Sequence, residues 1–334
     1  MLPIKTHKIL STHRQRHRQS LRLFPHRKRP GLTTGKNPSL VVPEVRKERP
    51  RWPLWTSPVS CIRFFWVTQP ALLDKSIVVM GGTTGLGLSA VHACVAAGAR
   101  VVAVGRKPEN VAAMSTLGEA VRGLVGDASD PGTAPKAIDE AISAFGSFDG
   151  LYHVAGGSGR GHGDGPLHEL SDEGVDFTLD MNLKSVLYSN RAAARQFLAA
   201  GVPGSVVNMG STLAFSPSPR YFATHAYTAA KAGIIGLTRA AAAHYAPRDI
   251  RFNVVAPALV ETPMAARAHE NPEILEYIST KQPLDGGRSG KPPDADAAVV
   301  FFLGDASRFV TGQVLAVDGG WSVSEGQHPD KLEP

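Results

Sequence analysis

The sequence predicts a single α/β domain in which helices cover both faces of a doubly wound parallel β-sheet. Two observations predict this fold class. From Leu72 onward, short apolar runs of strand length alternate with helical patterns, which is the order that crossover helices give to a parallel sheet of about seven strands. The composition, 43% hydrophobic and 19% charged with 34 Gly and 25 Pro, is that of a globular protein.

Short segments rich in Val, Ile, Leu and Ala have the length and composition of buried strands. In chain order they are Ser76–Met80, Arg100–Val104, Val121–Val125, Gly150–Ala155, Ser205–Met209, Arg251–Val255 and Val314–Val317. Helical patterns separate them, and the clearest span Leu86–Ala97, Val175–Ala199 and Ala226–Tyr245. No uninterrupted apolar run of about 18 residues occurs, so neither a transmembrane helix nor a membrane partner is expected.

Charge is divided unevenly between the N-terminal stretch and the rest of the chain. Residues 1–70 hold fifteen Lys and Arg against Glu44 and Glu48, a net charge of +13, whereas the remainder carries −6. The basic stretch shows no sustained helical or strand period and cannot bury enough apolar surface to offset its chain entropy. We therefore expect residues 1–70 to be a disordered or non-native extension, residues 71–325 to form the α/β domain, and residues 326–334 to be a tail.

Three interpretations of residues 1–70 compete. A basic arm could bind nucleic acid, but no folded nucleic-acid-binding module accompanies it, so this partner is not expected. An Arg-rich, acid-poor segment also fits an organellar transit peptide, although it lacks a clear amphipathic helix. We prefer a dispensable or untranslated segment, with initiation nearer Val67. The two cysteines, Cys61 and Cys94, lack metal-ligand spacing, so we expect no metal site, no disulfide framework and a cytoplasmic setting.

A glycine-rich turn follows the first predicted strand and opens a helix. Glycines let a backbone approach a pyrophosphate closely, and the free N–H groups of a helix N-terminus attract its charge. The spacing differs from the common G-x-G-x-x-G, and in isolation it would equally suit a tight turn. Its place directly after the first strand favours a phosphate cradle. The residues predicted to form it are Gly81, Thr83, Thr84, Gly85, Leu86 and Gly87.

The end of the second predicted strand bears on the choice of cofactor. An NAD-preferring site places a carboxylate here, against the ribose 2′-hydroxyl. This chain has Arg106 and Lys107 instead, which suit a 2′-phosphate. NADP(H) is therefore the predicted cofactor, with NAD(H) as the alternative if the two cations lie in a solvated loop. Asp127, followed by Ala128, is placed to accept from the adenine amino group, although Asp is also a common turn residue.

Ser211, Tyr227 and Lys231 form the predicted proton-transfer cluster. Tyr227 and Lys231 are four residues apart in a helical stretch, so their side chains share one face. A tyrosine hydroxyl ordinarily titrates near ~10, and a neighbouring ammonium, together with an oxidised nicotinamide, would lower that pKa toward the useful range. Ser211 follows the fifth strand, at the sheet edge where such folds bind ligands, and could donate to a substrate oxygen.

From about Leu72 to Ser322 the sequence resembles the classical short-chain dehydrogenases/reductases, which have a Rossmann-like fold. The glycines of the turn match the family's cofactor glycines, and Ser211, Tyr227 and Lys231 match its catalytic positions. Asn182 matches the helix asparagine that holds a proton-relay water. Asn253–Thr262 resembles the segment that fixes the nicotinamide carboxamide, and Thr311–Gly320 resembles the closing strand. The resemblance implies further cofactor contacts from Ala155, Gly156, Pro257, Val260 and Thr262.

Several segments depart from the family pattern. His153 stands where asparagine is typical, and we interpret it as a structural residue at a strand end. The additional segment Ser216–Phe222 is expected to reshape the substrate pocket. Gly156–Gly165 is a glycine-dense loop that could either flex over the active site or act as a linker, and Pro263–Pro292 is the expected lid.

The resemblance implies an NAD(P)-dependent oxidoreductase that interconverts a secondary alcohol and a ketone on a small-molecule substrate. It also implies a homo-oligomer, a dimer or tetramer, and alanine-rich faces at Ala192–Ala194 and Ala240–Ala243 would permit close helix packing. The alternative is a non-catalytic nicotinamide-binding sensor or scaffold of the same fold, which would not need a proton relay. An epimerase or dehydratase relative is disfavoured, because little chain follows Tyr227.

Overall fold

The computed structural model describes residues 69–327. The predictions made for the basic stretch, apart from its last two residues, and for most of the C-terminal tail therefore lie outside the described residues. Within residues 69–327, no helix is both long enough and apolar enough to cross a lipid bilayer.

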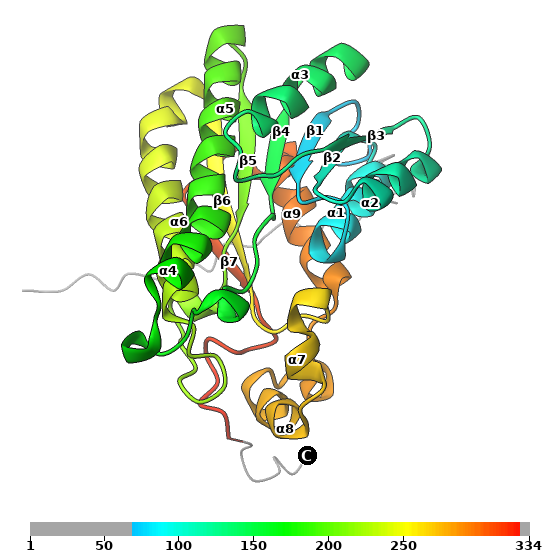
Figure 1. The fold of residues 1–334 in the computed structure, drawn as a ribbon. Helices are drawn as coiled ribbons and strands as arrows, with labels where there is room; N and C mark the ends of the chain where they lie inside the picture. The colour runs from blue at the N-terminus through cyan, green and yellow to red at the C-terminus, as the bar shows by residue number, and fades with distance from the viewer. Residues whose placement is uncertain (1–68, 328–334) are drawn as a thin grey trace, which may run out of the picture. The chain divides into compact units, whose positions relative to one another are not determined.

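The described part of the chain forms one parallel sheet with strand order β3-β2-β1-β4-β5-β6-β7 (Figure 1). The order reverses between β1 and β4, which creates the switch point where ligands of such sheets bind. This architecture confirms the predicted doubly wound fold. The strands are β1 (Ser76–Met80), β2 (Arg100–Gly105), β3 (Val121–Val125), β4 (Gly150–His153), β5 (Gly204–Met209), β6 (Ile250–Pro257) and β7 (Val314–Val317).

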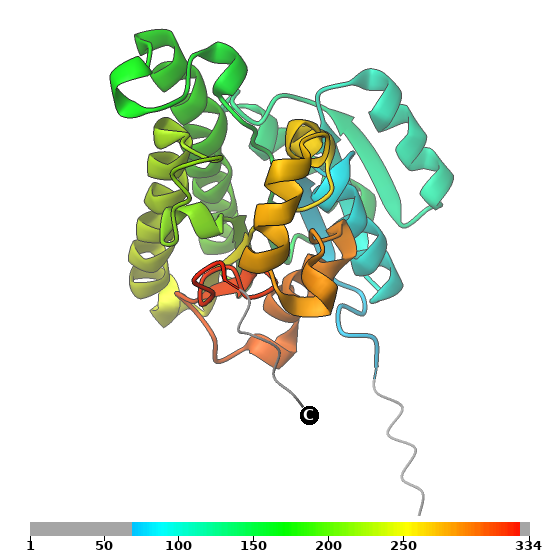
Figure 2. The ribbon, with the colours of Figure 1, turned by 90° about the horizontal axis from the view of Figure 1, so that it is seen from below.

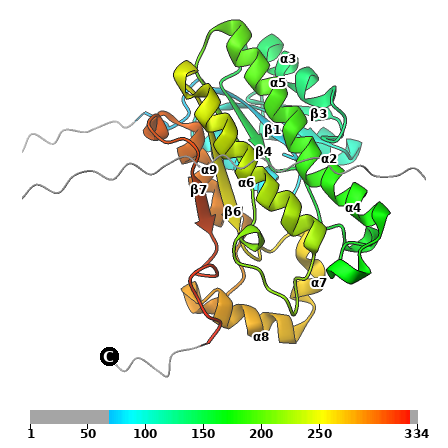
Figure 3. The same ribbon diagram turned by 90° about the vertical axis from the view of Figure 1, so that its left-hand side faces the viewer.

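Helices cover the two faces of this sheet. Helices α1 and α9 pack together on one face, and α3, α5 and α6 cover the other, as Figures 1 and 3 show. The helices are α1 (Gly85–Ala96), α2 (Pro108–Ala112), α3 (Thr133–Phe145), α4 (Asp172–Leu179), α5 (Ser185–Ala200), α6 (His225–Tyr245), α7 (Ala266–His269), α8 (Pro272–Lys281) and α9 (Asp296–Leu303).

The two cores arise from the period-two alternation of the strands. In β1, Ile77 and Val79 face the cluster that contains α1 and α9, whereas Val78 and Met80 face the cluster that contains α3 and α5. All four side chains are fully buried. A strand that is buried on both faces needs a continuous apolar run, and this is why the strands could be found in the sequence.

Several predicted boundaries were wrong, and two of the differences bear on the site. Strand β4 ends at His153 rather than Ala155, because the backbone N–H groups of Val154 and Ala155 both donate to the carbonyl of Met80 and so leave the ladder. The helix predicted over Val175–Ala199 is divided into α4 and α5 by a π turn at Asp180–Lys184. Such turns are frequent at functional sites, and no periodicity in the sequence signals this one.

Helices α7 and α8 lie beyond the carboxyl ends of the strands, as Figures 2 and 3 show. A small separate core holds them there, in which Ile274 and Ile278 of α8 pack with Leu259 after β6 and Trp321 after β7. This region contains the predicted lid. It places a wall opposite the strand ends, where the glycine turn and the predicted catalytic residues emerge.

Candidate active site

A cavity of about 610 Å³ lies at the carboxyl ends of the strands. Its wall is formed by the glycine turn after β1, the ends of β2, β5 and β6, the start of α6 and the residues around α7. Clefts at this edge are the usual ligand sites of doubly wound sheets, and this volume is typical of small-molecule sites. The cavity is therefore the candidate active site.

The glycine turn leaves backbone exposed to the cavity. Gly81 has φ +90, and a Cβ there would lie 2.7 Å from the backbone nitrogen of Ala155. At Gly87, in the first turn of α1, a Cβ would lie 2.0 Å from the carbonyl oxygen of Gly81. Side chains cannot occupy these positions, so the N–H groups at the start of α1, which lack helical partners, remain approachable. This cradle fits the phosphates of a dinucleotide.

At the end of β2, the two predicted cations have different surroundings. Arg106 lines the cavity. Lys107 does not; it precedes α2 as an exposed N-cap residue. Asp127 also lines the cavity and accepts the N–H and hydroxyl of Ser129 at 2.9 and 2.7 Å. Partial burial opposes ionisation, yet these bonds and the charge of Arg106 hold the pKa of Asp127 below its usual range.

Ser211, Tyr227 and Lys231 meet on one wall of the same cavity. Ser211 follows β5, and its side chain accepts from the backbone of Leu213 at 3.3 Å. Tyr227 and Lys231 lie on successive turns of α6, with the lysine Nζ 5.5 Å from the centre of the tyrosine ring. Lys231 donates to the carbonyl oxygen of Met209 at 3.0 Å, which ties the helix to the end of β5.

Burial governs the protonation of this cluster. It raises the pKa of Tyr227 to about 12, and the hydrogen bond with Ser211 opposes the shift. Burial also lowers the pKa of Lys231 to about 8. The predicted lowering of the tyrosine pKa is thus absent in the protein alone, because loss of hydration outweighs the hydrogen bond with Ser211. At neutral pH the phenol is protonated and can act as an acid.

Asn182 is buried in the π turn and does not line the cavity. Its amide nitrogen donates to the carbonyls of Gly157 and Thr178, both at 2.9 Å, and its oxygen accepts from the Gly157 N–H at 3.1 Å. A Cβ at Gly156 would lie 2.7 Å from that oxygen and 3.6 Å from the Lys231 amine. The asparagine therefore holds the loop after β4 close to the amine of Lys231.

The start of α6 is capped by a residue far away in the sequence. Asp164, in the glycine-dense loop, is buried, and its carboxylate oxygens accept from the backbone N–H groups of Ala226 and Tyr227, each at 3.0 Å. These donors have no partner within the helix, and the negative charge of Asp164 is also stabilised by the positive end of the helix dipole. The loop is thus tied to the helix that presents Tyr227.

His153 lies behind the cavity rather than in its wall. Its ring nitrogens lie 2.6 Å from the Ser189 hydroxyl and 3.2 Å from the Ala155 carbonyl. Burial lowers the pKa of His153 to about 3, and the charge of Lys231 adds to the shift. A neutral histidine held by hydrogen bonds at a strand end agrees with the structural role expected from the sequence.

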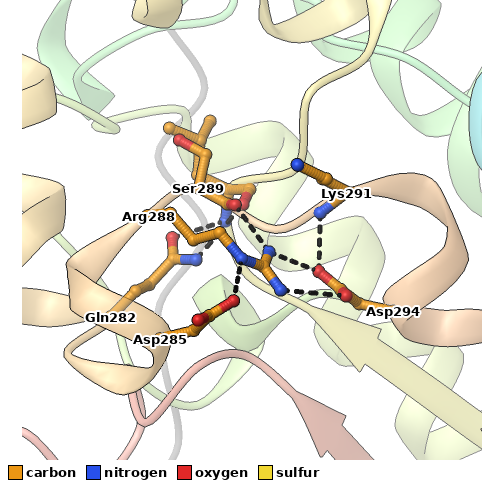
Figure 4. A network of polar contacts seen from close by, with 7 residues as sticks. Gln282, Asp285, Arg288, Ser289, Lys291 and Asp294 are labelled. Atoms are coloured by element: carbon orange, nitrogen blue, oxygen red, sulfur yellow. Dashed lines mark hydrogen bonds and ion pairs between the residues drawn. The ribbon is translucent and has the colours of Figure 1, made fainter.

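A polar network supports the loop after β6 (Figure 4). The Gln282 side chain exchanges two hydrogen bonds with the backbone of Leu259, at 3.0 and 3.2 Å, and so fixes Leu259, which also lines the cavity. Arg288 binds both carboxylate oxygens of Asp294, at 2.7 and 3.1 Å. The labelled members of the network are Gln282, Asp285, Arg288, Ser289, Lys291 and Asp294.

The structure gathers most of the predicted site residues around one cavity. The exceptions are Asn182 and Lys107. The predicted residues that line it are Gly81, Thr83, Thr84, Gly85, Leu86, Gly87, Arg106, Asp127, Ala128, Ala155, Gly156, Ser211, Tyr227, Lys231, Pro257, Val260 and Thr262.

The sequence analysis missed part of the wall. Arg160, Phe222, Met264, Arg267 and Trp321 also line the cavity. Four of these lie in segments that the sequence had marked: Arg160 in the glycine-dense loop, Phe222 in the additional segment, and Met264 and Arg267 in the expected lid. A charged side chain within a glycine-dense loop was a usable signal, whereas nothing in the sequence indicated Trp321.

Comparisons with known proteins agree with this geometry. Residues 81–322 match the family model described as enoyl-(acyl carrier protein) reductase. The 2-dehydro-3-deoxy-D-gluconate 5-dehydrogenase of Escherichia coli is 33% identical over 257 residues, which cover 75% of this chain and 96% of that protein. The L-rhamnose 1-dehydrogenase (NAD(P)(+)) of Azotobacter vinelandii is 32% identical over 265 residues, which cover 76% of this chain and 98% of that protein.

A solved structure gives the same result. The short-chain type dehydrogenase/reductase from Mycobacterium ulcerans superposes with a TM-score of 0.69 at 32% sequence identity, over 76% of this chain and 92% of that one. The family match covers the glycine turn, strands β2 to β7 and the helix that carries Tyr227 and Lys231. It begins after the basic N-terminal stretch.

Proposed function

The chain belongs to the classical short-chain dehydrogenase/reductase family and is an NAD(P)-dependent oxidoreductase, and from this premise we propose that it interconverts a secondary alcohol and a ketone through Ser211, Tyr227 and Lys231. The observation that carries the proposal is their convergence on the cavity that also contains the glycine cradle. A nucleotide bound along the cradle would share that cavity with a substrate beside the phenol.

In the proposed reduction, Tyr227 donates its proton to the carbonyl oxygen, and the Ser211 hydroxyl donates a hydrogen bond to the same oxygen. When bound, the nicotinamide supplies the hydride. Lys231 places positive charge beside the phenol, which favours the phenolate that proton transfer leaves behind. Asn182 acts through the loop after β4 and, as in the family, would keep a relay water near the lysine.

The proposed reaction is tested by following the absorbance of NADPH and NADH across a panel of ketones and the corresponding alcohols. The relatives named above act on a sugar and a sugar acid, so the panel begins with sugar-derived and cyclic ketones. Turnover of at least one ketone and of its alcohol in the reverse direction is the expected result. A protein that binds NADPH and yet consumes none of the panel would contradict the proposal and favour the sensor interpretation.

We also propose NADP(H) as the preferred cofactor, supported by Arg106 in the cavity wall and by the lack of a carboxylate at the end of β2. Arg106→Ala is expected to weaken NADP⁺ binding roughly 10-fold, about the effect of one charge-assisted hydrogen bond, while NAD⁺ binding stays nearly unchanged. Fluorescence titration with each cofactor measures both dissociation constants.

Lys107→Ala is the matched control for this experiment, because it removes the adjacent cation, which does not line the cavity. It should leave both dissociation constants unchanged. Equal losses for NADP⁺ and NAD⁺ in Arg106→Ala would show that the arginine does not recognise a 2′-phosphate, and the preference for NADP(H) would then fail.

A homo-oligomer is proposed from the family resemblance. The alanine runs contribute less than the sequence suggested, because Ala193, Ala194 and Ala242 face the core of their own chain. Exposed apolar side chains remain on α5, where Leu187 and Leu198 are 42% and 45% accessible. Light scattering is expected to give the mass of a dimer or tetramer, and Leu187→Asp should shift it toward the monomer. A monomeric wild-type protein would refute the proposal.

A further inference from the structure

Two arginines from distant segments meet in the wall of the cavity. Arg160 lies in the glycine-dense loop after β4, and Arg267 lies in α7; both line the cavity. Each donates an Nη2 hydrogen bond to the same carbonyl oxygen, that of Tyr221, at 3.1 Å. The two guanidinium groups are therefore close neighbours, although more than a hundred residues separate them along the chain.

The positive charge of this pair is not neutralised by a bound carboxylate. Among residues 69–327, neither arginine forms a salt bridge. Asp164 is the acid that acts on Arg160, but its oxygens are taken by the N-terminus of α6. The pKa of Arg160 is lowered by burial and by the charge of Arg267, against the opposing effect of Asp164. Two like charges are thus held together beside the cavity.

Aromatic side chains lie beside the arginine pair, whose own side chains are exposed to solvent. The Arg267 guanidinium lies 5.9 Å from the centre of the Phe222 ring, and Phe222 packs edge-on against Trp321. Phe222, Met264 and Trp321 line the cavity together with the arginines. The acid described in the cavity wall, Asp127, is bound to Ser129 and acts on Arg106, so it belongs to the predicted cofactor side.

We propose that Arg160 and Arg267 bind an oxoanion on the substrate, a carboxylate or a phosphate, so that the protein acts on anionic ketones and alcohols. Guanidinium groups present paired N–H donors that match the oxygens of such groups. An incoming anion would also relieve the repulsion between the two cations. This inference rests on the proposed reaction and adds to it the chemical class of the substrate.

The test uses matched ketones that differ in charge. The carboxylate pair is 4-oxocyclohexanecarboxylate and its methyl ester; the phosphate pair is dihydroxyacetone phosphate and dihydroxyacetone. With NADPH and the full chain, kcat/KM for the anionic member of at least one pair should exceed that of its neutral partner by roughly 10-fold or more. The pair that shows this preference identifies the oxoanion.

Arg160→Gln and Arg267→Gln should each raise the KM for the anionic ketone by roughly 10-fold with little change in kcat, and the double variant should lose the preference. The KM for the neutral ketones should rise by less, because these ketones carry no oxoanion. Arg220→Gln is the matched control, since this arginine is in the same region but pairs with Glu273 and does not line the cavity. It should behave as the wild type.

A second readout does not depend on turnover. In the presence of NADPH, the anionic compounds should raise the melting temperature of the wild type but not of the double variant. A preference for the neutral compounds, an anion preference that survives in the double variant, or no anion effect on either readout would overturn the inference. Arginine-dependent stabilisation without any ketone turnover would support the anion site and reject the proposed reaction. Turnover of neutral ketones alone would support the proposed reaction and reject the anion site.

Discussion

Tyr227→Phe is expected to lower kcat by roughly 10² to 10⁴-fold, the range contributed by a positioned acid or base. The substitution removes one oxygen from a half-buried side chain and leaves the ring against Lys231 in place. In the proposed reaction that oxygen is the source of the proton, and a water molecule in the cavity would lack the fixed position that helix α6 gives the phenol. NADPH binding should change little, since the glycine cradle is untouched.

Tyr245→Phe is the control, because Tyr245 ends the same helix and packs against Phe252 in the core. Its turnover should match that of the wild type. Circular dichroism and NADPH titration would establish that Tyr227→Phe is folded and binds cofactor. If a folded Tyr227→Phe protein kept more than a tenth of the wild-type kcat, Tyr227 would not be the proton donor.

Acid is expected to destabilise the protein through His153. The folded-state pKa of about 3 lies below the ordinary value of 6.5, so between these values the unfolded chain binds a proton that the folded protein excludes. The contribution of His153 is therefore complete above the unfolded pKa and declines as the pH falls from about 6.5 toward 3. From pH 7 to pH 5 the free energy of unfolding should fall by about 2 kcal/mol from this group.

Urea unfolding of the wild type and of His153→Asn at both pH values measures this effect. The variant has no titrating ring at this position, so its pH dependence should be smaller by about the same 2 kcal/mol, even if its overall stability is lower. His92→Asn, at an exposed position of α1, should retain the wild-type pH dependence. Identical pH dependence in the wild type and His153→Asn would contradict the buried, neutral histidine.

Local sequence patterns were sufficient for the fold and for the centre of the site. Apolar runs identified the strands, because strands buried on both faces consist mostly of apolar residues. The glycines after β1 marked the cradle, because only glycine fits the backbone contacts at Gly81 and Gly87. The i, i+4 spacing put Tyr227 and Lys231 on one helix face, as the structure has them. Each of these signals lies within a few neighbouring residues.

Contacts between distant residues had to come from the tertiary structure. Arg106 reaches the cavity and Lys107 does not, a distinction that depends on how the chain turns after β2. Asp164 caps α6 by binding the Tyr227 N–H, 63 residues along the chain. Arg160 and Arg267 both donate to the carbonyl of Tyr221, which is 61 residues from the first and 46 from the second. The protonation of Tyr227 and His153 depends on burial by the whole fold. The sequence by itself determined the sheet and the shared helix face of Tyr227 and Lys231, because these follow from local periodicity. The tertiary structure decided which charges line the cavity, because long-range packing sets those positions.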